Sequence, residues 1–294
     1  MKQFHGIMTA LVTPLTKDNT VDEAKMSKLV NFQIENGVSS LLVLGGTGEY
    51  SALTVEERTH AVEATVRAAA GRVPVVAGVL DPGIGEAIKC GKSFKAAGAD
   101  ALLVLTPFYV HPNQDGIIDF YKKFDQELNC PFLIYNIPYR TYVNILPETV
   151  EKLVDELPNL VGMKECSPSF GQALELIHRV GDRISVLSGE EFLCGGEMLL
   201  GADGAVMATA NLVPDVWVKV YQAAERQDIP QMRALLKTYF PLFKLMFKEI
   251  NPGPLKYAMG KIGIDAGELS IPLRAPSAAL QAEIDAELKK LGIL

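Results

Sequence analysis

The stretch Leu160-Val-Gly-Met-Lys-Glu-Cys-Ser-Pro168 leads from a short apolar run to a favoured helix start. Its apolar part, Leu160–Met163, does not alternate with polar residues, which is typical of a parallel strand buried on both faces. Ser167 can cap the free N–H groups of a helix, and Pro168 has no N–H to lose at the first helical position. The stretch therefore predicts a strand followed directly by a helix.

The same pattern recurs along the first three quarters of the chain. In Thr54-Val-Glu-Glu57 the spacing is that of a capping box, with Thr54 as N-cap and Glu57 reaching back, and Pro147 and Pro214 mark similar helix starts.

Eight strand–helix units fit between residue 7 and about residue 225, which predicts a closed TIM (β/α)₈ barrel, with a doubly wound open sheet as the alternative. The other apolar runs are Ile7–Val12, Ser40–Leu44, Pro74–Val79, Ala101–Leu105, Phe132–Tyr135, Ile184–Leu187 and Gly204–Met207.

Strand signals stop after residue 225. The remainder is predicted to form three helices, interrupted at Asn251-Pro-Gly-Pro254 and at Ser270–Pro276, and no low-complexity linker precedes it. We therefore expect a barrel catalytic domain at residues 1–225 and a C-terminal helical extension at 226–294 packed on it.

Composition narrows the classes of function. The chain has 294 residues and a net charge of −7, which argues against general nucleic-acid binding. No apolar run is long enough to span a membrane, and the four histidines show no metal-ligand spacing. The four widely spaced cysteines suit reduced thiols. We expect a cytoplasmic protein that binds neither nucleic acid, membrane nor metal.

Lys164 is the first candidate for catalysis, because it lies at the end of an apolar run. Active sites of (β/α)₈ barrels form at the C-terminal ends of the strands. Burial there disfavours an ammonium ion, and a neutral amine can attack a ketone to form an imine that serves as an electron sink. The alternative is a lysine paired with Glu165 or another carboxylate.

Other polar residues follow predicted strands. Tyr135 could shuttle protons beside such an imine or be a core tyrosine. The Gly45–Glu49 loop, with Thr47, could hold a carboxylate or be a tight turn. Arg140 could bind a carboxylate or form a surface ion pair. The neighbouring acids Glu190 and Glu191 could bind substrate hydroxyls or be solvated.

Together these residues resemble the dihydrodipicolinate synthase / N-acetylneuraminate lyase family, and the likeness extends over nearly the whole chain. Each motif is weak alone, but their order and spacing are highly specific. The matching segments are the G-x-x-x-A-x-x-T-P pattern of Gly6–Pro14, Gly45–Glu49, Thr106–Tyr109, Tyr135–Pro138 with Arg140-Thr141, Gly162–Glu165, Ser188-Gly189, Gly201–Gly204 and Asn251-Pro252.

The resemblance implies a pyruvate-dependent lyase or synthase that acts on a 2-oxo acid and an aldehyde, as a homotetramer built from dimers and without a metal or organic cofactor. It implies that Lys164 forms the Schiff base and that Tyr135 relays protons. Tyr109 matches a tyrosine that reaches the site across the dimer interface. Arg140 matches the residue that binds the second substrate's carboxylate. Residues implied to contact substrate are Gly46, Thr47, Gly189, Glu190, Glu191 and Val206.

Three departures from the synthase pattern bear on the reaction. Synthases usually carry a threonine at the position of Gly46. Pro82 and Phe108 stand where some synthases have an asparagine and a tyrosine of their lysine-feedback site. The leading hypothesis is condensation of pyruvate with aspartate semialdehyde. The alternatives are an aldolase or dehydratase acting on a 2-keto-3-deoxy sugar acid, an N-acetylneuraminate lyase-like aldolase, and a non-catalytic protein that only binds a keto acid.

Overall fold

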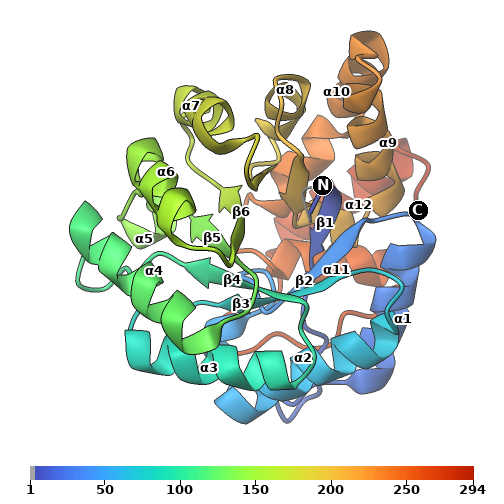
Figure 1. The fold of residues 1–294 in the computed structure, drawn as a ribbon. Coiled ribbons are helices and arrows are strands. Elements are labelled where there is room, and N and C mark those ends of the chain that lie inside the picture. The colour runs from blue at the N-terminus through green and yellow to red at the C-terminus, as the bar shows by residue number, and fades with distance from the viewer. Residues whose placement is uncertain (1–3) are drawn as a thin grey trace.

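Eight parallel strands close into a barrel in the order of the chain, as the computed structural model of residues 4–294 shows (Figure 1). β1 pairs with β8 through Gly6 and Gly204, and that pairing closes the cylinder. The prediction of a (β/α)₈ barrel is confirmed, and the open sheet is excluded. The strands are β1 Gly6–Ala10, β2 Ser40–Val43, β3 Val75–Val79, β4 Ala101–Leu105, β5 Phe132–Asn136, β6 Leu160–Glu165, β7 Ser185–Ser188 and β8 Gly204–Met207.

Helices surround the barrel, and three further helices follow it (Figure 1). The predicted starts at Pro147 and Pro214 are confirmed, as are three helices in the C-terminal region. Within residues 4–294, no helix has the length and apolar character needed to cross a membrane. The helices are α1 Glu23–Glu35, η1 Tyr50–Ala52, α2 Val55–Ala69, α3 Ile84–Ala96, α4 Gln114–Leu128, α5 Pro138–Thr141, α6 Pro147–Glu156, α7 Phe170–Val180, α8 Cys194–Leu199, η2 Thr209–Asn211, α9 Pro214–Glu225, α10 Ile229–Met246, α11 Gly253–Lys261 and α12 Ala278–Lys290.

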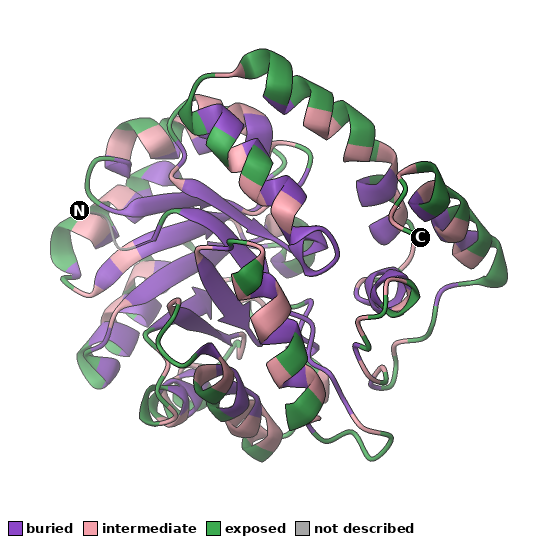
Figure 2. Ribbon diagram, turned by 90° about the vertical axis from the view of Figure 1, so that its right-hand side faces the viewer, coloured by how far each residue is buried: buried purple, intermediate pink, exposed green. Residues whose placement is uncertain are grey.

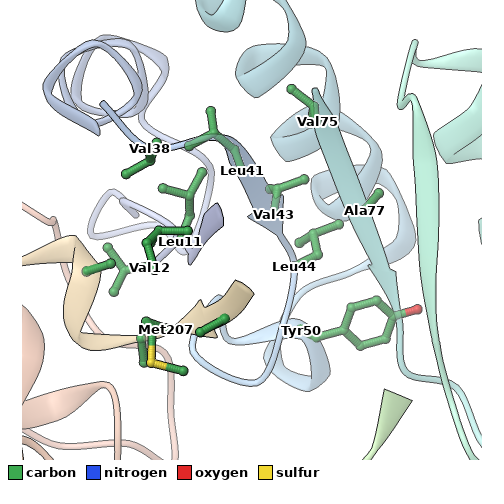
Figure 3. Packing of buried hydrophobic residues seen from close by; sticks show 14 of the residues in the cluster. Leu11, Val12, Val38, Leu41, Val43, Leu44, Tyr50, Val75, Ala77 and Met207 are labelled. Carbon is green, nitrogen blue, oxygen red and sulfur yellow. The ribbon is translucent and has the colours of Figure 1, made fainter. Parts of the chain in front are cut away.

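The strands bury both faces, which explains their continuous apolar runs. On β2 and β3, Leu41, Val43, Val75 and Ala77 belong to the large layer between barrel and helices (Figure 3). The alternate residues, such as Leu42, fill the barrel interior. Figure 2 shows the result: the strands are almost wholly buried, the helices around the barrel bury their inner faces, and α10 is largely exposed in its first half.

The predicted cap of α7 differs from the structure, whereas the predicted N-cap of α2 does not. α7 begins at Phe170, and its N-cap is Ser169, whose hydroxyl accepts from the N–H of Gln172. The start at Ser167-Pro168 is wrong because β6 continues to Glu165 and needs a connection before the helix. Thr54 caps α2 as predicted.

The other contact of the predicted capping box, from the Glu57 side chain back to Thr54, is wrong. The Glu57 carboxylate does not reach back to Thr54 but accepts from the N–H of Val21, 2.8 Å away. A long-range partner thus takes the place of the local one, and α2 is tied to the segment before α1.

The pairing of β5 with β6 contains a bulge that matters for the site. Phe132 pairs with Leu160, but Leu133 pairs with Gly162, so Val161 is the extra residue. The shift places Tyr135 opposite Lys164 instead of opposite Met163. Glycine is needed at position 162, because a β-carbon there would lie 3.0 Å from Leu133 Cδ2 of β5 and 2.9 Å from the carbonyl oxygen of Ser185 in β7.

Candidate active site

Lys164 and Tyr135 lie side by side at the C-terminal ends of β6 and β5. Lys164 is 7% exposed, and its Nζ lies 4.5 Å from the centre of the Tyr135 ring. Among residues 4–294, no carboxylate lies within ion-pair distance of this amine, and Glu165 bonds to other groups. The alternative of a Lys164–Glu165 pair is therefore wrong. The structure brings together a buried amine and a phenol in the barrel mouth.

A small cavity of about 50 Å³ adjoins Lys164, and a larger one of about 340 Å³ lies outside it. We call them the inner and the outer chamber. Lys164, Thr47 and Glu191 line only the inner chamber. The two chambers are adjacent, because five residues line both: Gly46, Tyr135, Ile137, Arg140 and Asn251.

The loop after β2 presents polar groups to the inner chamber. Thr47 is buried, and its hydroxyl accepts from Asn251 Nδ2 at 2.9 Å, which leaves the hydroxyl proton free to be donated. In the part of the chain that the structure describes, the N–H groups of Gly46 and Thr47 donate to no protein acceptor. A β-carbon at Gly46 would meet nothing within 4 Å. The loop can therefore receive an anion such as a carboxylate.

Glu191 supplies a buried carboxylate to the inner chamber. Its Oε1 accepts from the N–H groups of Ala208 and Thr209, at 2.9 and 3.2 Å. Burial raises the pKa of Glu191 to about 7, and nearby Lys164 opposes that shift. Burial also raises the pKa of Glu190, which a hydrogen bond from Tyr139 counteracts. Glu191 is therefore not a solvated loop charge.

Replacing Glu191 tests this burial. A carboxyl whose pKa rises on folding stabilises the fold fully below its unfolded pKa and loses that contribution as pH rises through about 7. In Glu191→Gln the amide oxygen can still accept both N–H groups, without a buried charge. We expect the melting temperature of the variant to exceed that of the wild type at about pH 8. At about pH 5 we expect this gap in melting temperature to be smaller. An equal gap at both pH values contradicts the prediction. Glu190→Gln, at a less buried site, is the control.

The remaining predicted residues divide into two groups. Gly189 and Val206 line the inner chamber, and a β-carbon at Gly189 would lie 2.1 Å from Cys166 Sγ and 2.8 Å from Lys164 Cε. Arg140 faces the chambers and has no carboxylate within ion-pair distance among residues 4–294. Tyr109 is 84% exposed and lines neither chamber, so its role across a dimer interface stays a prediction.

Three polar or ionisable residues that line the inner chamber were missed by the reasoning from sequence. Asn251 comes from the loop before α11, Tyr139 precedes Arg140, and Cys166 follows Lys164 by two positions. Cys166 could have been found because alternate residues of a strand face the same side, and Tyr139 because it is next to Arg140 in the short segment after β5. Within residues 4–294, no cluster of His, Cys, Asp and Glu side chains is arranged to hold a metal ion.

Known proteins match nearly the whole chain. The model of the dihydrodipicolinate synthetase family matches residues 3–291. The 4-hydroxy-tetrahydrodipicolinate synthase of Hyphomonas neptunium is 39% identical over 292 residues, which cover 99% of each chain. The enzyme of that name from Methanocaldococcus jannaschii is 38% identical over 99% of this chain and 100% of its own.

Solved structures agree in fold at similar identity. The dihydrodipicolinate synthase from Aquifex aeolicus has a TM-score of 0.95 and 36% identity, and 99% of each chain is covered. The chloride-inhibited enzyme from Acinetobacter baumannii, solved in complex with pyruvate, has a TM-score of 0.95 and 34% identity, with 99% of this chain and 100% of the other covered.

Proposed function

This chain belongs to the dihydrodipicolinate synthetase family and is an enzyme of the lyase class, and from that premise we propose that it condenses pyruvate with aspartate semialdehyde through a Schiff base on Lys164. The observation that carries the proposal is a buried lysine amine without a carboxylate partner, beside a tyrosine and an anion-receiving loop. The Acinetobacter baumannii relative, which was solved with pyruvate, supports that choice of first substrate.

Each step can be assigned to a described side chain. The amine of Lys164 attacks the keto carbon of pyruvate, and loss of water leaves the imine. Thr47 and the free N–H groups of its loop bind the pyruvate carboxylate. Tyr135 moves protons to and from the adduct. The protonated imine withdraws electrons, so the methyl carbon gives up a proton through Tyr135 and, as an enamine, attacks the aldehyde carbon. The aldehyde oxygen takes up a proton, and displacement of the imine by water or by the substrate's amine frees Lys164.

The outer chamber suits the second substrate. Its volume of about 340 Å³ exceeds that of the inner chamber, and Arg140 lines both. A guanidinium group binds a carboxylate through two parallel hydrogen bonds. We therefore assign Arg140 to the carboxylate of the semialdehyde.

Gly46 favours a second candidate, an aldolase or dehydratase of 2-keto-3-deoxy sugar acids. The open space beside Gly46 enlarges the inner chamber where synthases carry a threonine. Assays separate the candidates: the proposed synthase consumes pyruvate only when semialdehyde is present, whereas the alternative enzyme transforms keto-deoxy acids. Absence of turnover with semialdehyde removes the proposed second substrate.

Borohydride trapping tests the Schiff base itself. Reduction in the presence of pyruvate is expected to add one reduced pyruvyl group per chain, located at Lys164 by peptide mapping. Omission of pyruvate is the control. Pyruvate binding without any adduct would instead favour a protein that only binds a keto acid.

The proposal also covers assembly, cofactors and location. We propose that the chain forms a homotetramer built from dimers, as its family resemblance implies. The exposed Tyr109 and Val110, at 84% and 77%, suit a contact with a second copy. The covalent imine on Lys164 takes the place of a cofactor. The four cysteines are buried free thiols, which suits the reducing cytoplasm.

A further inference from the structure

A second pair of residues lies directly behind the reacting pair. In the pairing of β5 with β6, Asn136 is opposite Glu165, one position beyond Tyr135 and Lys164. Successive side chains of a strand point to opposite faces. Lys164 and Tyr135 therefore face the barrel interior, whereas Asn136 and Glu165 face the layer between the strands and the helices.

Glu165 is a buried carboxylate held by neutral donors. It is 2% exposed and Asn136 is fully buried. Asn136 Nδ2 donates to both oxygens of Glu165, at 3.0 and 3.2 Å. The N–H of Ser167 donates to Oε1 at 2.5 Å, and Gln172 Nε2 donates to Oε2 at 3.2 Å. Among residues 4–294, no cation lies within ion-pair distance of this carboxylate.

The same network fixes the segment that carries Arg140. Asn136 Nδ2 also donates to Asn144 Oδ1 at 2.8 Å, and Asn136 Oδ1 accepts from the N–H of Ile145 at 3.3 Å. Asn144 in turn exchanges hydrogen bonds with Gln172 of α7. The chain from Asn136 to Ile145, which includes Arg140 in α5, is thus held at both ends by this network.

Stability alone does not account for such a cluster. A buried carboxylate without a cation is costly, and an apolar pair of similar volume would serve packing better. Burial raises the pKa of Glu165 to about 7, which reflects that cost. Hydrogen bonds have the directionality that apolar packing lacks, and reacting groups must be held within fractions of an ångström.

We propose that Glu165 and Asn136 are positioning residues that set the distance and angle between Lys164 and Tyr135 from behind the strands. The inference rests on the proposed function. In Glu165→Gln one carboxylate oxygen becomes an NH₂ group, which faces N–H groups that had donated to that oxygen. We expect the ends of β5 and β6 to shift relative to each other as these groups move apart. We expect kcat to fall about 10- to 100-fold, while KM for pyruvate stays within about threefold because the Thr47 loop is untouched.

Asp125→Asn is the matched control. Asp125 is also a buried carboxylate that accepts from an asparagine amide, Asn159 Nδ2 at 2.8 Å, but it lies near the C-terminal end of α4, away from both chambers. We expect Asp125→Asn to lower the melting temperature about as much as Glu165→Gln does, but to leave kcat unchanged within about twofold. An equal fall of kcat in both variants overturns the proposal, since a general loss of stability would then explain it.

A double-mutant cycle with Tyr135→Phe tests the direct connection. If Glu165 acts by aligning Lys164 with Tyr135, the loss of kcat in the double variant is smaller than the product of the two single losses. If the fold-loss of kcat in the double variant equals the product of the two single fold-losses, the two residues act independently and the proposal is contradicted. If Glu165→Gln fails to fold, Gln172→Leu decides: a kcat loss of about threefold or more at constant KM supports positioning, and an unchanged kcat overturns it.

Wild-type trapping separates this inference from the proposed function. If borohydride and pyruvate label wild-type Lys164 and Glu165→Gln is labelled and turns over at the same rate, the positioning role is wrong and the Schiff base stands. If the wild type gains no pyruvyl group, the proposed function itself fails.

Discussion

Lys164→Ala is expected to abolish pyruvate-dependent trapping by borohydride and to lower kcat by roughly 10⁴-fold or more. The reason is the position of the amine: among residues 4–294, no second lysine lines the inner chamber, so no other amine can form the imine there. Intact-mass measurement after reduction and a steady-state assay check the two parts of the prediction.

The fold should survive this substitution. Lys164 makes no ion pair among the described residues, so its loss leaves no buried carboxylate without a partner. Lys164→Met, which retains the volume of the side-chain stem, controls for the space that alanine opens. An adduct that forms on Lys164→Ala at the wild-type rate would place the chemistry on another amine and remove Lys164 from the mechanism.

The barrel could be predicted from sequence because its strands are short and buried on both faces. Such strands appear as apolar runs whatever the detailed pairing, and Ala101–Leu105 and Gly204–Met207 were predicted with the observed bounds. The register was not predictable. Regular pairing from Phe132 and Leu160 would set Tyr135 opposite Met163, and only the bulge at Val161 sets it opposite Lys164.

Contacts between distant segments escaped prediction for a related reason. Asn251 and Thr47 are 204 positions apart in sequence, and no local pattern marks the amide that orients the hydroxyl. The motif Asn251-Pro252 was part of the family resemblance, but only the fold reveals that Asn251 lines both chambers. The C-terminal region therefore contributes directly to the site.

Lys256 shows how tightly this region is joined to the barrel. Its ammonium lies 2.6 Å from Glu49 Oε1, with side chains 4% and 0% exposed. It also donates to the carbonyl oxygens of Thr13 and Glu268, at 2.8 and 2.6 Å. Glu49 Oε2 accepts from the N–H of Ser270 at 2.7 Å. One buried ion pair thus links α11, the segment before α12 and the loop after β2.

Lys256→Met is expected to destabilise the protein by about 3–5 kcal/mol, because it leaves Glu49 charged and buried without a cation. Burial lowers the pKa of Lys256 and the attraction of Glu49 opposes that shift, so the two charges depend on each other. Thermal unfolding at fixed protein concentration measures the loss, which for a chain of this size amounts to several degrees or more.

Adding Glu49→Gln to Lys256→Met distinguishes the lost pair from the lost packing. The amide oxygen can still accept from the N–H of Ser270, and the unpaired charge is gone. We expect the double variant to recover a large part of the lost melting temperature. The main cost of the single variant is a buried carboxylate without a cation, rather than the loss of a favourable ion pair. Lys261→Met is the control, because Lys261 pairs with Asp285 at 3.1 Å with side chains 36% and 29% exposed, and loss of such a pair should change stability little. If the double variant is less stable than Lys256→Met alone, the ion pair is not what makes Lys256 important, and the bonds to Thr13 and Glu268 are.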